Sequence, residues 1–168
     1  FWGCVSIPWV LERIRTEGFP LRPRTEAFAR LSPEEFGDGL TAILDQPAAS
    51  SCGGAWAVLD SYAFTPGHHR RARDHARLLV VDDNNHLPSY EADILFNQNP
   101  AAGRIPYQGA IGEKCVGHRY ILIRSEFREL GRQAEERPRK ARAETDLVTL
   151  GGGEITPFLE DVVGLLAP

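Results

Sequence analysis

The hydrophobic pattern of the chain contains four short apolar runs with the length of β-strands. They are rich in valine, isoleucine and leucine, and their sequences are AWAVLD (55–60), ARLLVVDD (76–83), ADILFNQ (92–98) and RYILIR (119–124). Nearly continuous apolar character, without strict alternation, is typical of parallel strands covered on both faces. We therefore expect one parallel sheet whose four strands all end at the same edge.

Helix start signals lie before and between these runs. The stretch SPEE at 32–35 places an N-cap serine, a proline and a glutamate as in a capping box, and it predicts a helix over 33–46. A threonine and a proline open a second predicted helix over 65–76, and a third, over 7–17, ends at Gly18. Helices that alternate with strands predict the fold class α/β, with a Rossmann-like, doubly wound parallel sheet.

The last part of the chain differs in character from the rest. Residues 127–144 are dense in charge and predict an exposed helix or a linker, and 146–150 reads as one more strand. We assign 1–127 to one domain, 128–145 to a charged linker and 146–168 to the start of a second domain.

Composition and charge narrow the classes of function. With 42% hydrophobic and 25% charged residues, the chain has the composition of one soluble domain, and its net charge of -4 argues against a nucleic-acid partner. No run approaches the roughly 18 apolar residues of a membrane span. Three widely spaced cysteines, Cys4, Cys52 and Cys115, indicate neither a disulfide framework nor a metal site, so we expect a cytoplasmic protein.

Polar residues follow each predicted strand. In open parallel sheets, ligands bind outside the carboxyl ends of the strands, where the connecting loops converge. Singly, acids and amides at such places also act as turn formers and helix caps, but the set together favours a polar ligand such as a sugar with several hydroxyls. Its members are Asp60, Ser61, Tyr62, Asp82, Asp83, Asn97, Gln98, Asn99, Arg124, Glu126 and Phe127.

A run of glycines offers a second candidate site. Gly151, Gly152 and Gly153 stand before a predicted helix start, and bare backbone there suits phosphate binding, although a tight strand-to-helix turn has the same appearance.

The histidines and cysteines carry no recognisable catalytic motif. His68 and His69 are consecutive and would diverge by about 100° on a helix, which indicates solvated helix surface. His86 and His118 read as loop residues with local partners. No cysteine has an evident catalytic partner, so the catalytic residues stay unassigned.

Five ordered segments of the chain resemble one enzyme family. They are DSY (60–62), LLVVDD (78–83), ADILFNQN (92–99), GHRYILIRSEF (117–127) and LVTLGGG (147–153). Together they resemble the UDP-2,4-diacetamido-2,4,6-trideoxy-β-L-altropyranose hydrolases of the pseudaminic acid pathway and the related spore-coat polysaccharide proteins. The resemblance implies a GT-B-like fold, with the sugar held by the N-terminal domain and UDP mainly by the C-terminal one.

The resemblance also implies a reaction and a set of site residues. The reaction is the inverting hydrolysis of a UDP-sugar in nonulosonic acid and surface polysaccharide biosynthesis, by a monomer that uses no cofactor or metal. Phosphate would lie at Gly151, Gly152 and Gly153. The sugar pocket would be formed by Asp60, Tyr62, Asp82, Asp83, Asn97, Gln98 and Asn99, and closed by Tyr120, Glu126 and Phe127.

The chain departs from that family at both ends. The family begins with a strand and a G-x-G-H-x-x-R loop whose histidine is regarded as the base, and nothing before Phe1 supplies it. We therefore expect a domain truncated at both ends that is inactive alone. Two alternatives stay open: a GT-B glycosyltransferase, in which an acceptor hydroxyl replaces water, and a non-catalytic domain that binds a sugar nucleotide.

Overall fold

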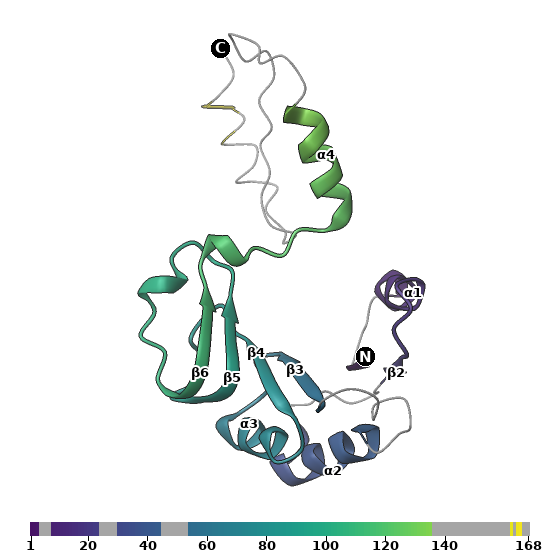
Figure 1. The fold of residues 1–168 in the computed structure, drawn as a ribbon, viewed down its shortest axis with the longest axis vertical. Helices are drawn as coiled ribbons and strands as arrows, with labels where there is room; N and C mark the ends of the chain where they lie inside the picture. Colours follow the sequence, from purple (N-terminus) through teal and green to yellow (C-terminus); the bar gives the residue numbers. More distant parts are fainter. Residues whose placement is uncertain (4–7, 24–29, 45–53, 136–161, 163, 166–168) are drawn as a thin grey trace. The chain divides into compact units, whose positions relative to one another are not determined.

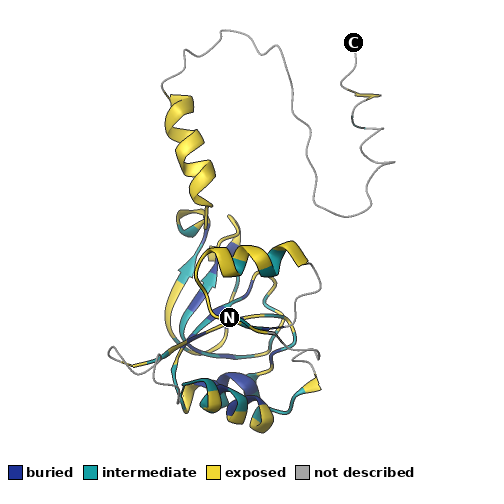
Figure 2. Ribbon diagram, turned by 90° about the vertical axis from the view of Figure 1, so that its right-hand side faces the viewer, coloured by how far each residue is buried: buried dark blue, intermediate teal, exposed yellow. Residues whose placement is uncertain are grey.

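The structure, a computed structural model, describes residues 1–3, 8–23, 30–44, 54–135, 162 and 164–165. It divides into two compact units, Phe1–Leu122 and Ile123–Pro168. The described part of the second unit is mainly helix α4 (Ser125–Glu135), which is exposed along its whole length (Figure 2). Among the described residues, no helix is long and apolar enough to cross a membrane.

The first unit is built on a parallel sheet with the strand order β3-β4-β5-β6 (Figure 1). Its strands are β3 (Trp56–Asp60), β4 (Arg77–Val81), β5 (Tyr90–Asn97) and β6 (Gly109–Val116). A separate parallel pair joins β1 (Trp2–Gly3) to β2 (Arg22–Pro23). The predicted strands at 55–60, 76–83 and 92–98 are confirmed, and the architecture is that of an α/β, Rossmann-like protein.

The predicted fourth strand at 119–124 is wrong. This stretch forms a short 3-10 helix, η3 (His118–Tyr120), and then a segment with exposed apolar side chains. The fourth strand is instead β6, which has little apolar content because it is an edge strand with one neighbour. Its first residue, Gly109, has φ 119°, and a Cβ there would lie 2.0 Å from the carbonyl oxygen of Tyr90. The pairing of β6 with β5 therefore depends on a close backbone approach at residue 109, which only glycine permits.

The predicted helices are confirmed with small shifts at their ends. Helix α1 spans Pro8–Thr16, α2 spans Pro33–Leu44 and α3 spans Pro66–Arg73. The capping box before α2 is present: Ser32 N–H donates to Glu35 Oε2 at 2.8 Å, and Glu35 N–H donates to Ser32 Oγ at 3.2 Å.

Helix α3 packs on β4 and β5, and α2 packs on α3. The helices contribute Phe36 and Leu40 of α2 and Ala72 of α3 to the core, and Phe64 joins them from the loop before α3. The remaining core side chains come from three strands and from the loop after β5, and they are Ala57, Leu59, Leu78, Val80, Tyr90, Ala92, Leu95 and Tyr107. Because α3 is covered by both α2 and the sheet, it has little free surface.

Burial of α3 corrects the interpretation of its histidines. His68 and His69 are 4% and 1% exposed, and so are not solvated. The His68 ring lies within hydrogen-bond distance of Thr65 Oγ1 and of the carbonyl oxygen of Leu31. His69 packs on the ring of Tyr90 instead. A helical pattern shows which residues share a face, but it does not show that two faces are covered.

The opposite face of the sheet is less covered than the apolar runs predicted. Along β3, Ala57 and Leu59 are buried, whereas Trp56 and Val58 are 47% and 62% exposed. The expectation that both faces are covered is therefore wrong for this strand within the described structure. The apolar side chains of β3 follow a two-residue alternation that the sequence conceals, because both faces carry hydrophobic residues.

Candidate functional site

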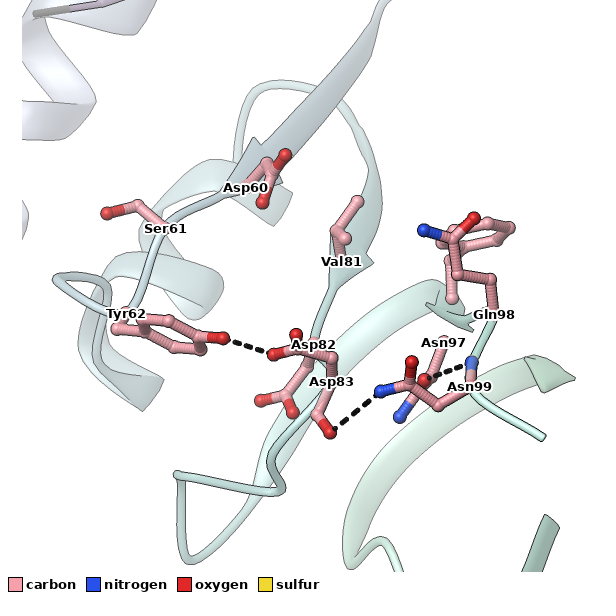
Figure 3. A pocket seen from close by; sticks show the side chains of 10 residues that line it. Asp60, Ser61, Tyr62, Val81, Asp82, Asp83, Asn97, Gln98 and Asn99 are labelled. Carbon is pink, nitrogen blue, oxygen red and sulfur yellow. Dashed lines mark hydrogen bonds between the residues drawn. The ribbon is translucent and has the colours of Figure 1, made fainter. Parts of the chain in front are cut away.

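The strand ends meet at one edge of the sheet, as the parallel pattern predicted. Asp60 at the end of β3 pairs in register with Val81 of β4, and Val81 pairs with Phe96 of β5. A cavity of about 240 Å³ opens at this edge (Figure 3). It is lined by Asp60, Ser61, Tyr62, Val81, Asp82, Asp83, Phe96, Asn97, Gln98 and Asn99.

Not every predicted site residue lies at this cavity. Tyr120 belongs to η3 and does not line it. Glu126 and Phe127 belong to α4 of the second unit, so their role at the cavity stays a prediction. The predicted phosphate site at residues 151–153 lies outside the described residues. Two lining residues that sequence reasoning missed, Val81 and Phe96, sit inside apolar strand runs.

Asp82 is a lining residue of the cavity whose carboxylate is buried. It is 1% exposed and accepts hydrogen bonds from the Tyr90 hydroxyl and from the N–H groups of Asn84 (2.8 Å) and Asn85 (2.6 Å). Its Oδ2 also lies 2.6 Å from His86 Nδ1. Burial opposes ionisation, but the hydrogen bonds outweigh it and lower the pKa of this carboxyl below its ordinary value. Asp82 is therefore an ionised structural anchor whose acceptor capacity is largely used.

Asn97 has a similar structural role one strand away. It is 1% exposed, its Nδ2 donates to the Tyr107 hydroxyl at 2.7 Å, and its Oδ1 accepts from Asn99 N–H at 2.9 Å. Tyr107 in turn donates to the carbonyl oxygen of Asp82 at 3.0 Å. This buried network ties the ends of β4 and β5 together and makes the cavity edge rigid.

The remaining polar side chains are open to a ligand. Asp60 and Asp83 are exposed, and Asp60 has no hydrogen-bond or ion-pair partner among the described residues. Gln98 uses its Oε1 to accept from Leu122 N–H at 3.0 Å, which leaves its two amide hydrogens available. Asn99 Nδ2 makes only a long contact of 3.4 Å to the carbonyl oxygen of Asp83 (Figure 3).

Tyr62 stands at the rim and is 59% exposed. Its hydroxyl donates to Asp83 (Figure 3). The same hydroxyl accepts from Asn84 Nδ2 at 2.9 Å. The bond to Asp83 raises the pKa of Tyr62, so the phenol stays protonated at neutral pH. The side chain offers a flat apolar surface to the cavity without entering the core.

His86 is a neighbour of the cavity that sequence reasoning did not select. Its Nδ1 lies 2.6 Å from Asp82 Oδ2, and its ring meets the Tyr62 ring edge-on at a centroid distance of 5.2 Å. The signal in the sequence is the D-D-N-N turn, in which Asp82 accepts two backbone N–H groups and Asn85 takes a left-handed φ of 53°. That turn places His86, four positions after Asp82, next to the Asp82 carboxylate.

The charge of the cavity limits what it can bind. Among the described residues, its lining contains three aspartates and no lysine, arginine or histidine. No group of three or more histidine, cysteine, aspartate or glutamate residues in the described part of the chain could hold a metal ion. The half-buried side chains of Val81 and Phe96 add an apolar surface between the polar groups. This arrangement suits a neutral ligand with several hydrogen-bonding groups and one apolar face.

The class of the first unit is thus an α/β domain with a polar cavity at the carboxyl edge of a parallel sheet. Comparison with known proteins adds no family: no family model, curated protein or solved structure matches the chain.

Proposed function

We propose that the cavity binds the sugar of a UDP-linked diacetamido-trideoxy sugar, and that the chain is part of a GT-B-like UDP-sugar hydrolase of nonulosonic acid and surface polysaccharide biosynthesis. The observation that carries the proposal is the composition of the cavity. A pyranose ring has an apolar C–H face, which fits Val81 and Phe96, and polar substituents, which fit carboxylate and amide groups. Acetamido groups and hydroxyls both donate hydrogen bonds, and Asp60 and Asp83 are open acceptors.

The diphosphate of such a substrate requires a different binding surface. Two or more negative charges next to Asp60, Asp82 and Asp83 would be repelled, and the described lining supplies no cation to offset this. In the proposed enzyme, the nucleotide is therefore held outside this cavity, in the second domain to which 146–168 was assigned.

A non-catalytic domain that binds a sugar nucleotide is the second candidate. It is favoured by one observation: the described lining offers no cationic donor to stabilise a departing diphosphate, which inverting hydrolysis requires. Both candidates bind the sugar. Turnover by this chain would exclude the non-catalytic candidate, whereas absence of turnover fits both, because the hydrolase is expected to be inactive as this chain alone.

The first expected result concerns sugar binding and Tyr62. By isothermal titration calorimetry, the chain should bind the UDP-linked diacetamido sugar more tightly than UDP alone. Tyr62→Phe should weaken binding of the sugar nucleotide by roughly 2- to 12-fold, since it removes one hydroxyl worth about 0.5–1.5 kcal/mol. Its melting temperature should change little, because the ring is mostly exposed. Equal affinity for UDP and for the sugar nucleotide would overturn the proposal.

The second expected result is the absence of fast turnover by the chain alone. Without cationic donors at the leaving group, the step should lack a stabilisation that is typically worth 10²–10³-fold for a single donor. The measurement is UDP release from the sugar nucleotide, followed over hours at high protein concentration. Turnover at rates of about 1 s⁻¹ or faster would contradict this expectation, and it would favour a complete catalytic site within these residues.

A further inference from the structure

Gln98 presents hydrogen-bond donors to a cavity whose described lining groups are mainly acceptors. It is the first residue after β5, it is exposed, and it lines the cavity. The three carboxylates of the lining are acceptors, and the Tyr62 hydroxyl already donates to one of them. The amide of Asn97 is engaged at both ends, by the Tyr107 hydroxyl and by Asn99 N–H. Gln98 is therefore a main source of free donors in this cavity.

A bond from the backbone fixes the orientation of the Gln98 amide. Leu122 N–H donates to Gln98 Oε1 at 3.0 Å. A backbone N–H is always a donor, so only the oxygen of the amide can face it. The two hydrogens on Nε2 then have no partner among the described residues. In Figure 3, the amide nitrogen of Gln98 lies on the side that faces Val81 and Asp60. The bond to Leu122 thus turns the donor end of the amide toward other lining residues.

We propose that Gln98 is a specificity-determining residue, whose Nε2 donates a hydrogen bond to the carbonyl oxygen of one acetamido group of the bound sugar. The proposal rests on the proposed sugar-binding function and adds to it the chemical group that is recognised. Hydroxyls and acetamido N–H groups are donors, and they suit the carboxylates of Asp60 and Asp83 instead.

The length of the acetamido group provides the discrimination. Its carbonyl oxygen lies two bonds farther from the sugar ring than a hydroxyl oxygen on the same carbon. A donor placed for the carbonyl therefore does not reach the hydroxyl in the same pose, and the amide of Gln98 loses its partner. The cavity thus favours an acetamido group over a hydroxyl at that position of the sugar.

The first test exchanges the donor for an acceptor. Gln98→Glu keeps the length of the side chain and an oxygen for Leu122 N–H, but it replaces the amide NH₂ with a second oxygen. The probes are the UDP-linked diacetamido sugar and two analogues, in each of which one acetamido group is replaced by a hydroxyl. They are titrated into the full chain by calorimetry.

Wild type should bind the diacetamido sugar roughly 2- to 12-fold more tightly than one of the two analogues, which is the gain from one hydrogen bond. In Gln98→Glu this preference should vanish or reverse, because a carboxylate accepts from a hydroxyl and repels a carbonyl oxygen.

The variant Gln108→Glu is the matched control for the added charge. Gln108 is also exposed, but it lies directly before β6, at the opposite edge of the sheet, and it does not belong to the described lining. This variant should keep the wild-type preference among the three probes. Both variants should keep a melting temperature close to that of wild type, since each side chain is exposed.

A second measurement observes the amide directly. In ¹H–¹⁵N correlation spectra of the full chain, the two side-chain N–H signals of Gln98 are assigned by their loss in Gln98→Glu. Saturation with the UDP-linked diacetamido sugar should shift them, and unmoved signals would contradict a direct contact.

The outcomes separate this proposal from the function on which it rests. Failure of the wild-type chain to bind the sugar nucleotide more tightly than UDP overturns both. If wild type binds the sugar nucleotide and Gln98→Glu shows the same preference among the three probes, only the role of Gln98 is overturned.

Discussion

Replacing Asp82 with alanine is expected to lower the free energy of unfolding of the first unit by about 3 kcal/mol or more. The substitution leaves the fully buried Tyr90 hydroxyl without its acceptor, and it removes the carboxylate from two backbone N–H groups and from His86. Hydrogen bonds to a charged group contribute about 1.5–3 kcal/mol each, and they are not additive within one network. Urea denaturation monitored by circular dichroism measures the change.

The neighbouring aspartate is the matched control for this prediction. Asp83 is exposed, and among the described residues its carboxylate bonds only to Tyr62 at the rim, so Asp83→Ala should stay within about 0.5–1 kcal/mol of wild type. Tyr90→Phe should fall between the two, because it removes the donor but leaves the carboxylate with its other partners. Similar losses for both aspartates would show that Asp82 does not anchor the loop in the way described.

Acidification from pH 6.5 to 4 is expected to destabilise the first unit through His69 by up to about 3 kcal/mol. His69 is 1% exposed, its Nδ1 is buried without a hydrogen-bond partner among the described residues, and burial lowers its pKa from 6.5 to about 4. Between these values the unfolded chain binds a proton that the folded chain resists, so stability falls as the pH falls. Above pH 6.5 both states are neutral and His69 adds no pH dependence.

The variant His69→Leu isolates this contribution from the other titrating groups. It removes the ionisable ring and its unpaired nitrogen, so stability at pH 7.5 should be equal to or above that of wild type. The difference between wild type and variant should widen in favour of the variant as the pH falls to 4. Chemical denaturation at several pH values measures both curves, and parallel curves would mean that folding does not lower the pKa of His69.

Much of the fold follows from local patterns in the sequence. The capping box at Ser32 and Glu35 and the strand runs ending at Asp60 and Asn97 appear in the structure where local chemistry places them. These features depend on backbone propensity and on short-range hydrogen bonds, which neighbouring residues decide. By contrast, RYILIR at 119–124 has the composition of a strand but does not form one, and Gly109–Val116, which is less apolar, pairs with β5 as the fourth strand.

The candidate site also follows partly from local sequence patterns and partly from tertiary packing. The sequence by itself determined that acids and amides follow the strands, and parallel topology is enough to predict that they meet at one edge. Only the tertiary structure decided that Asp82 is a buried anchor whereas Asp83 is an open rim residue, since this depends on Tyr90 and on which way each side chain points. It also decided that Val81 and Phe96 reach the cavity, that His68 and His69 are buried, and that His86 returns to Asp82. The physical reason is that burial and hydrogen-bond partners come from elements distant in the chain, whose packing no local pattern encodes.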